Sequence, residues 1–503
     1  MRIALVNGPL QSAVCDFGVG HQMPLGLLMI GGPLLDHRHA VTLIDAARHH
    51  LSDDEIVRRV AAFGAEVVMI AHVGSTSAHS CCLRVLRAIK AALPEIVTVY
   101  GGVHPTYHYR AVLGEHPEVD IVVRGEGEAT VIELVATLEQ QRTALTLACD
   151  LSSVAGIAWR RAGVVVANAA RAPITDLDAY RIGWELIENW DDYKAFGLGR
   201  AAVVQFSRGC PHTCTYCGQW MFWRHWRHRD ITRFVDELAM LHTTHGVRFF
   251  WLADENPTTI KEVWRQALEE IARRNLPIAL CGSLRAQDIV RDADILPLYQ
   301  QAGFAYVLMG VETVTDDTLG KIHKGSSVDD AYQAVRLLRQ HHILSIVDYI
   351  FGLEEETPRT LWRGLRGLLR YDGDFVNALY ITPHAWTPLG HQQLKAGTVI
   401  EANTWKWDYR HQVLAVKHLT PTQLFIGVKL VELCYHLTPR RLWRILTIRD
   451  RTQRRLLRYS LWHTSLVYWY EIVEFAAARL RRKQKPVQAS GQQFVLHPRA
   501  ETV

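Results

Sequence analysis

QFSRGCPHTCTYCGQW, residues 205–220, is the most informative stretch of this 503-residue chain. It overlaps the end of the apolar run AAVVQF, which predicts a buried strand. Its cysteines, Cys210, Cys214 and Cys217, have the spacing CxxxCxxC. Because iron–sulfur clusters are held by cysteine thiolates, gaps of three and two residues let one loop hold three corners of a [4Fe–4S] cluster. Three ligands for four irons leave one iron open to bind and reduce a small molecule.

A structural zinc site is the alternative for these three cysteines. His212 lies inside the loop and could act as the fourth ligand that zinc requires. No second CxxC pair follows at zinc-finger spacing, so the cluster is favoured. The remaining cysteines are too unevenly spaced for a disulfide framework, and we expect them to be small core hydrophobes. They are Cys15, Cys81, Cys82, Cys149, Cys281 and Cys434.

Apolar runs recur from residue 201 to about residue 390, each followed by a polar turn and a helical pattern. Six such runs occur: AAVVQF, VRFFWLA, PIALCGS, AYVLMGVE, LSIVDYIFG and FVNALYIT. Six strand–helix units fit a partial (βα)6 barrel better than a second open sheet. The chemistry is therefore expected at the carboxyl ends of these strands.

The first part of the chain shows the same alternation and predicts an α/β domain. Strands are expected at residues 2–6, 41–45, 66–72, 96–100 and 119–123. The segment SDDEIVRRVAAFG predicts a helix that Ser52 caps, with Ile56 and Val60 on its apolar face. Five such strands predict a flavodoxin-like, doubly wound sheet. The expected domains are residues 1–150, a linker with a hairpin at 151–200, the barrel at 201–390 and a helical C-terminal domain at 391–503.

Composition limits the functions open to the chain. Hydrophobic residues make up 49% of it, which excludes disorder and predicts a sizeable core. The formal charge of +5 is too small for a general nucleic-acid coat, so no nucleic-acid partner is expected. The start, MRIALVNGPLQ, predicts a strand rather than a signal peptide, and no run of 18 uncharged apolar residues occurs. We therefore expect a cytoplasmic protein without a transmembrane span.

The C-terminal segment RYSLWHTSLVYWYEIVEFAAARLRRKQK predicts one long helix with a basic end. Its aromatic side chains are Trp462, Tyr468, Trp469 and Tyr470. A helix packed on the protein, with a solvated basic tail, is the favoured interpretation. A helix that lies on a membrane surface, and so a peripheral membrane contact, is the alternative.

With Tyr216 before its last cysteine, the motif reads CxxxCx(aromatic)C and resembles that of the radical S-adenosylmethionine (SAM) superfamily. The resemblance implies that the open iron chelates the amino and carboxylate groups of SAM. Electron transfer would then cleave SAM and give a 5′-deoxyadenosyl radical that abstracts hydrogen. The superfamily also implies a partial (βα)6 barrel, in agreement with the six units found above, and an external electron donor such as flavodoxin or ferredoxin.

Polar residues at three strand ends resemble the SAM contacts of that superfamily. They are Asp254, Glu255 and Asn256 after the second barrel strand, Ser283 and Arg285 after the third, and Glu312 after the fourth. The first group resembles the segment that bonds the methionyl amine, and the others are candidates for ribose or carboxylate contacts. A helix N-cap for the first group, and structural ion pairs for Arg285 and Glu312, are the alternatives, because acids at the end of a buried strand need partners.

A doubly wound sheet ahead of such a barrel resembles the cobalamin-binding subgroup of the superfamily. The candidate cobalamin contacts follow the third to fifth strands: Ser75, Thr76, Gly101, Gly102, His104, Gly125, Glu126 and Gly127. Glycines let the backbone approach a bulky ligand, and hydroxyls can bond a nucleotide tail, although ordinary tight turns are the alternative. The first loop, NGPLQSAVCDFG, lacks the DxHxxG motif of cobalamin mutases, so histidine ligation from that loop is not expected.

Segments between residues 205 and 419, among them CGQWMFWRHWRHRD and RYDGDFVNALYITPHAWTPLG, resemble the anaerobic magnesium-protoporphyrin IX monomethyl ester cyclases of bacteriochlorophyll synthesis. The resemblance implies a radical SAM oxidoreductase that forms the isocyclic E ring with oxygen from water and gives divinyl protochlorophyllide. The candidate contacts to the tetrapyrrole are Trp220, Trp223, Arg227, His384, Trp386 and Arg410. Aromatic faces stack on a porphyrin, arginine pairs with propionate, and histidine ligates magnesium or transfers protons. Helical core packing is the alternative for the tryptophans.

Two other functions would use the same cofactors. A cobalamin-dependent radical SAM C-methyltransferase would transfer a methyl group to a tetrapyrrole or another substrate. A cobalamin or tetrapyrrole sensor would keep the fold without turnover. The intact CxxxCxxC motif and the acidic strand end argue against the sensor.

Overall fold

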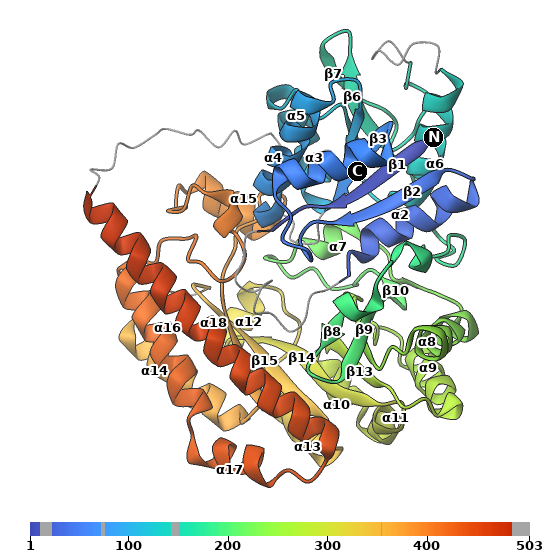
Figure 1. Cartoon of the computed structure of the whole chain (residues 1–503). Coiled ribbons are helices and arrows are strands. Elements are labelled where there is room, and N and C mark those ends of the chain that lie inside the picture. Colours follow the sequence, from blue (N-terminus) through green and yellow to red (C-terminus); the bar gives the residue numbers. More distant parts are fainter. Residues whose placement is uncertain (11–22, 72–75, 142–149, 354, 485–503) are drawn as a thin grey trace. The chain divides into compact units, whose positions relative to one another are not determined.

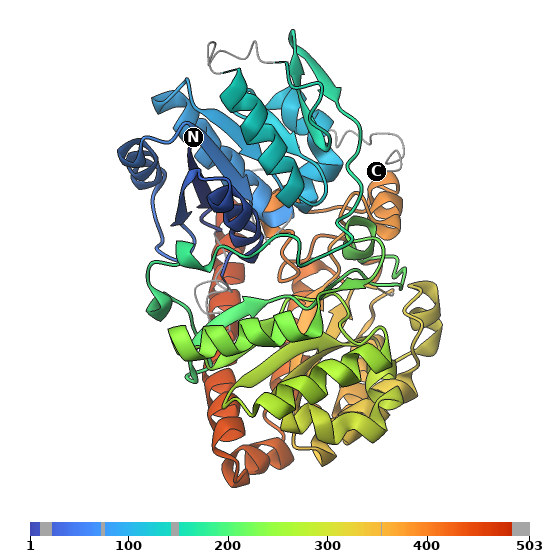
Figure 2. The same cartoon turned by 90° about the vertical axis from the view of Figure 1, so that its right-hand side faces the viewer.

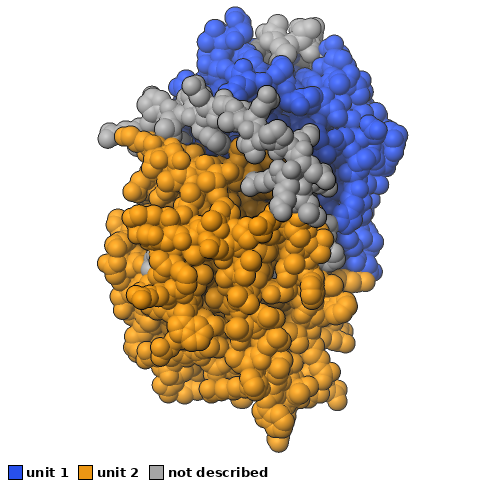
Figure 3. All heavy atoms as spheres, turned by 90° about the vertical axis from the view of Figure 1, so that its left-hand side faces the viewer, with its two compact units in different colours: residues 1–11, 23–192, 498–503 blue, residues 12–22, 193–497 orange. Residues whose placement is uncertain are grey.

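The computed structural model describes residues 1–10, 23–71, 76–141, 150–353 and 355–484, with side chains up to residue 479. It divides into two compact units, which Figure 3 colours separately. Of the described residues, 1–10 and 23–192 form unit 1, and those from 193 onward form unit 2. The four-part division expected from the sequence stays a prediction.

Unit 1 is built on one seven-stranded sheet with the order β2-β1-β3-β4-β5-β6-β7. Its parallel strands are β1 (Arg2–Asn7), β2 (Ala40–Asp45), β3 (Val67–Ala71), β4 (Val97–Tyr100) and β5 (Ile121–Val123). The hairpin β6 (Ile157–Arg161) and β7 (Val164–Ala167) extends the sheet in antiparallel fashion. The crossover helices are α2 (Leu25–Asp36), α3 (Asp53–Phe63), α4 (Thr76–Ala92), α5 (Val103–Glu115) and α6 (Glu128–Gln140). The predicted flavodoxin-like α/β fold is confirmed.

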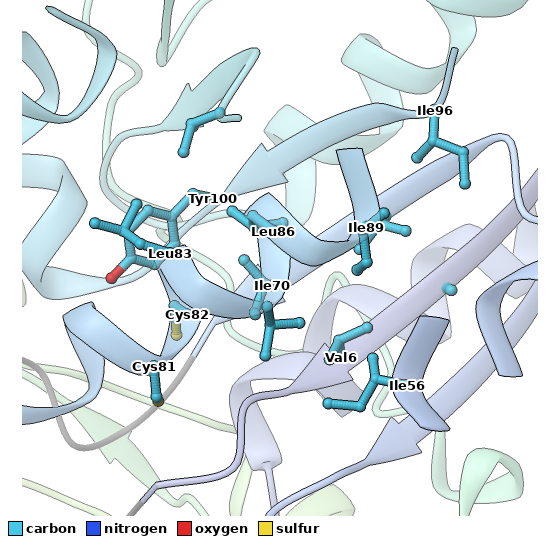
Figure 4. Packing of buried hydrophobic residues seen from close by; sticks show 14 of the residues in the cluster. Val6, Ile56, Ile70, Cys81, Cys82, Leu83, Leu86, Ile89, Ile96 and Tyr100 are labelled. Atoms are coloured by element: carbon cyan, nitrogen blue, oxygen red, sulfur yellow. The ribbon is translucent and has the colours of Figure 1, made fainter. Parts of the chain in front are cut away.

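Local sequence signals explain how these elements begin, end and pack. The Ser52 side chain accepts a hydrogen bond from the Glu55 amide at the start of α3, and Gly64 ends that helix with a left-handed φ of 65°. The core beside α4 includes Cys81 and Cys82, which lie with Ile70, Leu86 and Tyr100 in Figure 4. These two cysteines are core hydrophobes, as predicted.

Unit 2 contains the second seven-stranded sheet, with the order β16-β15-β14-β13-β12-β9-β8. Six parallel strands match the six predicted runs: β9 (Gly199–Val204), β12 (Phe249–Leu252), β13 (Ala279–Leu284), β14 (Phe304–Glu312), β15 (Leu344–Phe351) and β16 (Phe375–Tyr380). The short strand β8 (Lys194–Ala195) pairs antiparallel with β9. Because β8 and β16 are the two edges, the described sheet is open, and the predicted partial barrel is confirmed.

Helices of the barrel units lie on the outside of this sheet (Figures 1 and 2). They are α8 (Ile231–His245), α9 (Lys261–Arg274), α10 (Ala286–Arg291), α11 (Leu296–Gln301), α12 (Asp316–Lys321), α13 (Val328–Gln340) and α14 (Pro358–Tyr371). Apolar side chains at helical spacing explain their placement. On α9, for example, Trp264, Leu268 and Ile271 are buried while the opposite face is charged.

The C-terminal part of unit 2 is helical, as predicted. It contains α15 (Pro388–Lys395), α16 (Pro421–His436), α17 (Pro439–Thr447) and α18 (Arg451–Gln484). Helix α16 packs on α14 and β16, and α18 runs beside α16, where the rings of Phe425 and Phe475 stack at 4.0 Å. In the part of the chain that the structure describes, no helix is long and apolar enough to cross a membrane.

The outcome for the remaining cysteines differs from residue to residue. Cys281 is buried on β13, as predicted, but Cys434 is exposed on α16. The prediction was wrong for Cys434, because α16 has a face that no other described element covers. Cys15 and Cys149 lie outside the described residues.

Candidate functional site

The three cysteines of the CxxxCxxC motif lie on the loop between β9 and the short helix α7 (Gln219–Phe222). Two backbone hydrogen bonds hold this loop from outside: Thr215 donates to the Ile322 carbonyl, and Leu389 donates to the Thr215 carbonyl. Inside the loop, the Trp220 indole donates to the Cys214 carbonyl at 3.1 Å. The loop is therefore fixed by residues far away in sequence.

The charges and pKa values of the cysteine thiols indicate how well the loop could hold the cationic iron–sulfur core. Burial raises the pKa of Cys217 to about 11, and the nearby charges of Cys214 and Cys210 add to the rise. The Arg285 guanidinium reaches Cys214 Sγ at 3.9 Å. The charges of Cys210 and Cys214 are near enough to raise the pKa of Cys217, so three thiolates in this loop would repel one another, and bound iron would remove that cost. The loop residues therefore fit a [4Fe–4S] cluster.

The acidic end of β12 holds the base of the same loop. The Asp254 carboxylate accepts hydrogen bonds from the Phe206 amide at 3.1 Å and the Ser207 hydroxyl at 2.6 Å. Burial, followed by the charge of Asp254, raises the pKa of Glu255 to about 8, and the Gly209 amide donates to Glu255. Asp254 thus positions the loop, while its predicted contact with SAM stays a prediction.

Asn256 and Arg285 have buried nitrogens that meet no hydrogen-bond acceptor in the described structure. Both residues are nearly fully buried, and the atoms concerned are Asn256 Nδ2 and Arg285 Nε. An unpaired buried donor is costly, so an acceptor from a ligand or from a water molecule would stabilise each position. SAM, with its carboxylate and ribose oxygens, fits these donors, whereas Ser283 is exposed on β13 and stays a prediction.

Glu312, Lys324 and Tyr216 form a buried polar group beside the cysteine loop. Lys324 Nζ lies 2.6 Å from Glu312 Oε1, and the Tyr216 hydroxyl donates to the same oxygen at 2.8 Å. Glu312 has a left-handed φ of 65° where β14 ends, which directs its backbone away from the strand. Lys324 was missed by sequence reasoning, because a lysine in a loop carries no periodic signal.

Asp348 lies on β15, next to this group. Asn377 on β16 donates to its carboxylate at 3.0 Å. Burial, and then the charge of Glu312, raises the pKa of Asp348 to about 7. Sequence reasoning missed this residue too, although an acid inside the apolar run LSIVDYIFG was a usable signal.

Two predicted substrate residues, His384 and Trp386, lie with Tyr409 beyond the end of β16. His384 Nε2 lies 2.6 Å from the Tyr409 hydroxyl, and the His384 and Trp386 rings stack at 4.8 Å. Trp386 also packs on Gly218 of the cysteine loop so closely that a Cβ there would collide with the indole. Tyr409 has a left-handed φ of 66°, and burial followed by the charge of Cys217 raises the pKa of its hydroxyl. This aromatic group therefore borders the cysteine loop.

The other candidate substrate residues lie on several different elements. The Arg208 guanidinium lies 5.0 Å from the Trp223 ring centroid, and Trp223 follows α7. Arg227 lies on a two-stranded ribbon, where its side chain donates to the His225 carbonyl. Arg410 lies 3.7 Å from Glu471 of α18. All four candidates in this group, Trp220 included, stay predictions.

The predicted cobalamin residues of unit 1 lie at the carboxyl ends of its strands. Gly102 and Gly125 have φ values of 109° and 79°, and a Cβ at either position would meet no atom within 4 Å. Such open positions fit a bulky ligand, which a side chain would obstruct. Gly101 is similarly uncrowded, whereas a Cβ at Gly127 would meet Ile30.

The remaining cobalamin candidates have protein partners or lie outside the described residues. His104 Nδ1 is 3.4 Å from the Thr76 hydroxyl, and the His104 ring stacks on His79 at 4.2 Å. Glu126 accepts a hydrogen bond from the Ile174 amide at 2.8 Å. Ser75 lies outside the described residues. The contacts of these residues with cobalamin stay predictions.

Comparisons with known proteins agree with both units. Residues 204–366 match the model of the radical SAM superfamily, and residues 18–135 match the B12 binding domain. The anaerobic magnesium-protoporphyrin IX monomethyl ester cyclase of Synechocystis sp. is 44% identical over 97% of this chain and 96% of its own length. The cyclase of the same name from Rubrivivax gelatinosus is 35% identical over 77% of this chain and 69% of its own.

A solved structure has the same overall arrangement of elements. The radical S-adenosylmethionine methyltransferase TsrM from Kitasatospora setae, with cobalamin and a [4Fe–4S] cluster bound, superimposes with a TM-score of 0.67. The match covers 87% of this chain and 89% of TsrM at 15% sequence identity. At that identity the likeness supports the fold alone.

Proposed function

This chain belongs to the family of anaerobic magnesium-protoporphyrin IX monomethyl ester cyclases, within the cobalamin-binding radical SAM enzymes, and we propose that it carries out their reaction. The product would be divinyl protochlorophyllide, formed by closing the isocyclic E ring with oxygen from water. The observation that carries the proposal is the 44% identity to a named cyclase over 97% of the chain. An identity of that extent covers both units, and so both cofactor-binding parts.

The cofactors of the family are a [4Fe–4S] cluster, SAM and cobalamin, and each has a fitting set of residues. Cys210, Cys214 and Cys217 would hold the cluster, and the unpaired nitrogens of Asn256 and Arg285 would bond SAM. When bound, the cluster supplies the electron that cleaves SAM and so starts hydrogen abstraction from the substrate. The carboxyl ends of the unit 1 strands would hold cobalamin.

The chain's own residues position these groups. Asp254 fixes the start of the cysteine loop through the Phe206 amide and the Ser207 hydroxyl. Glu312 holds Tyr216 of the loop from the other side, with Lys324 as its counter-charge. These buried contacts would keep the loop rigid while the substrate reacts beside it.

The substrate is proposed to lie against the aromatic group of His384, Trp386 and Tyr409. The Trp386 ring packs on Gly218 of the cysteine loop, so a tetrapyrrole stacked beside it would lie near the reacting centre. The hydrogen bond of 2.6 Å between the Tyr409 hydroxyl and His384 Nε2 fixes the imidazole and would let it hold or release a proton. An external flavodoxin or ferredoxin is proposed as electron donor, because reductive cleavage of SAM takes an electron that must reach the cluster from outside the chain. A cytoplasmic location is proposed because the cluster cysteines must stay reduced.

The decisive experiment is turnover of the anaerobically reconstituted protein with magnesium-protoporphyrin IX monomethyl ester in ¹⁸O-labelled water and methyl-labelled SAM. Mass spectrometry should show a product that has lost hydrogens and gained one ¹⁸O atom. A product that carries a labelled methyl group instead would refute the cyclase and establish a methyltransferase.

A pair of cysteine variants tests the proposed cluster ligands. Cys214→Ala should abolish the cluster absorbance and 5′-deoxyadenosine formation, whereas Cys434→Ala, on the exposed face of α16, should leave both unchanged. Absence of 5′-deoxyadenosine from the wild-type protein under reducing conditions would favour the sensor function.

A further inference from the structure

We propose that the outward face of helices α16, α17 and α18 binds the surface of an anionic lipid bilayer. Most of the large apolar side chains that the described residues leave exposed lie between residues 426 and 473. On a water-facing surface such a concentration is unusual and marks an interaction site. Figure 1 shows these three helices along one side of unit 2.

The apolar stripe of α16 is the first part of this face. Ile426, Leu430, Leu433 and Leu437 are 51%, 54%, 40% and 53% exposed. Their spacing of four, three and four residues places them on one face of the helix, the opposite of the usual amphipathic arrangement. Cys434, the other exposed residue in this span, is uncharged as well, so the stripe is continuous.

Helix α18 carries a second stripe. Trp462, Trp469 and Val473 are 64%, 64% and 63% exposed, and they are spaced by seven and four residues. The contacts between the two helices show that α16 and α18 are antiparallel. Phe425 meets Phe475, and further along α16 the Lys429 carbonyl accepts a hydrogen bond from Tyr468.

On each helix, the stripe is rotated about the helix axis relative to the contact residues. The rotation is about a quarter to a third of a turn, in the direction in which the chain winds. In two antiparallel right-handed helices, the same rotational offset points to the same side of the pair. The stripes of α16 and α18 therefore form one surface. Trp443 and Leu446 of α17, 69% and 68% exposed, lie on the segment that joins the two helices.

The exposed charged side chains around this face are mostly basic, which favours an anionic partner. The exposed charged side chains of α17 and α18 are Arg440, Arg451, Arg455, Arg458 and Arg479. The acids of these helices are engaged elsewhere: Lys429 pairs with Glu432 and Glu471, and His411 pairs with Glu474. Asp450, an exposed acid among the described residues of this region, caps the start of α18 through the Gln453 amide.

Tryptophan with an apolar ring and a polar N–H suits the boundary between lipid tails and headgroups, and arginine suits anionic headgroups. The bilayer is therefore the occupant that the composition of this face favours.

The test is sedimentation of the full-length protein with vesicles of phosphatidylcholine, with and without phosphatidylglycerol. We expect binding to the anionic vesicles that weakens as salt rises. The double variant Trp443→Ser/Trp469→Ser should bind about a hundredfold more weakly, because each large apolar side chain withdrawn from the interface costs about a factor of ten.

Two equally exposed valines provide a matched control. Val473 on α18 is 63% exposed and Val164 on β7 is 64% exposed. Val473→Ser should weaken vesicle binding and Val164→Ser should not, while thermal unfolding of both variants should match the wild type.

Three outcomes would overturn the proposal. The first is no binding of the wild type to anionic vesicles, and the second is equal binding by the wild type and the double variant. The third is a dimer in light scattering that the double variant converts to a monomer, since a second copy of the chain would then cover this face.

Discussion

The ion pair between Lys324 and Glu312 supports a quantitative prediction about the buried polar group beside the cysteine loop. Lys324 Nζ and Glu312 Oε1 are 2.6 Å apart, and the two side chains are only 8% and 6% exposed. Lys324→Met removes the cation but leaves the carboxylate buried. Loss of one partner from a buried pair costs about 3–5 kcal/mol, because the remaining charge is neither hydrated nor compensated.

The double variant Glu312→Gln/Lys324→Met should recover most of this loss. It removes both charges, and the amide oxygen of the introduced glutamine can still accept the hydrogen bond from Tyr216. Replacing a whole buried pair by neutral groups is often nearly neutral, so we expect the double variant to lie within about 1–2 kcal/mol of the wild type. The double variant should then be about 1–4 kcal/mol more stable than Lys324→Met alone.

The assay is denaturant unfolding of the anaerobically purified protein, with the midpoint and slope fitted for each variant. Lys321→Met is the matched control, because Lys321 pairs with Asp317 on the surface, where the side chains are 70% and 75% exposed. That pair should contribute less than about 1 kcal/mol. A Lys324→Met variant no less stable than Lys321→Met, or a double variant no more stable than Lys324→Met, would refute the reasoning.

Three further predictions concern other parts of the structure. The pKa of His411 is raised to about 9, chiefly by its hydrogen bonds to two carboxylates acting against burial, so its charge stabilises the fold fully below about pH 6.5 and is lost as pH rises through 9. His411→Gln should therefore lower the unfolding free energy by about 1–3 kcal/mol at pH 6 and have little effect at pH 10, measured by urea titration at both values. Gly218→Ala should displace Trp386 or the cysteine loop and cost about 1–3 kcal/mol, with a reduced yield of reconstituted cluster by absorbance. Gly102→Ala, at a φ of 109°, should cost about 1–2 kcal/mol and weaken cobalamin binding, measured by the visible spectrum, whereas an unchanged affinity would remove Gly102 from the proposed site.

The sequence alone predicted both sheets, because strand and helix periods are local properties. All five predicted strands of unit 1 and all six of the barrel are present, and they are parallel to one another within each sheet. The spacing CxxxCxxC predicted the cluster loop, since the reach of one loop depends on its own length. The Ser52 cap of α3 was predicted for the same reason, because capping involves residues only three apart.

The tertiary structure decided which polar groups are partners. The contact of Asp254 with SAM stays a prediction, and the structure shows in addition that its carboxylate is bonded to the Phe206 and Ser207 backbone, 48 and 47 residues earlier. Lys324 meets Tyr216 of the cysteine loop across 108 residues. No periodic signal encodes pairs so distant, because they depend on how the strands are ordered in the sheet.

The exposed face of α16 is a second feature that the sequence alone does not determine. Its apolar side chains recur at helical spacing, and that spacing alone does not determine whether a neighbouring element covers them. Whether an apolar stripe is covered depends on which neighbours reach it, and the described elements leave Leu430 and Leu437 more than half exposed. Local periodicity thus determined where the chain forms helices, strands and the cluster loop. Long-range packing determined which side chains meet, and which apolar face is left for a partner, because burial belongs to the assembled fold rather than to any one segment.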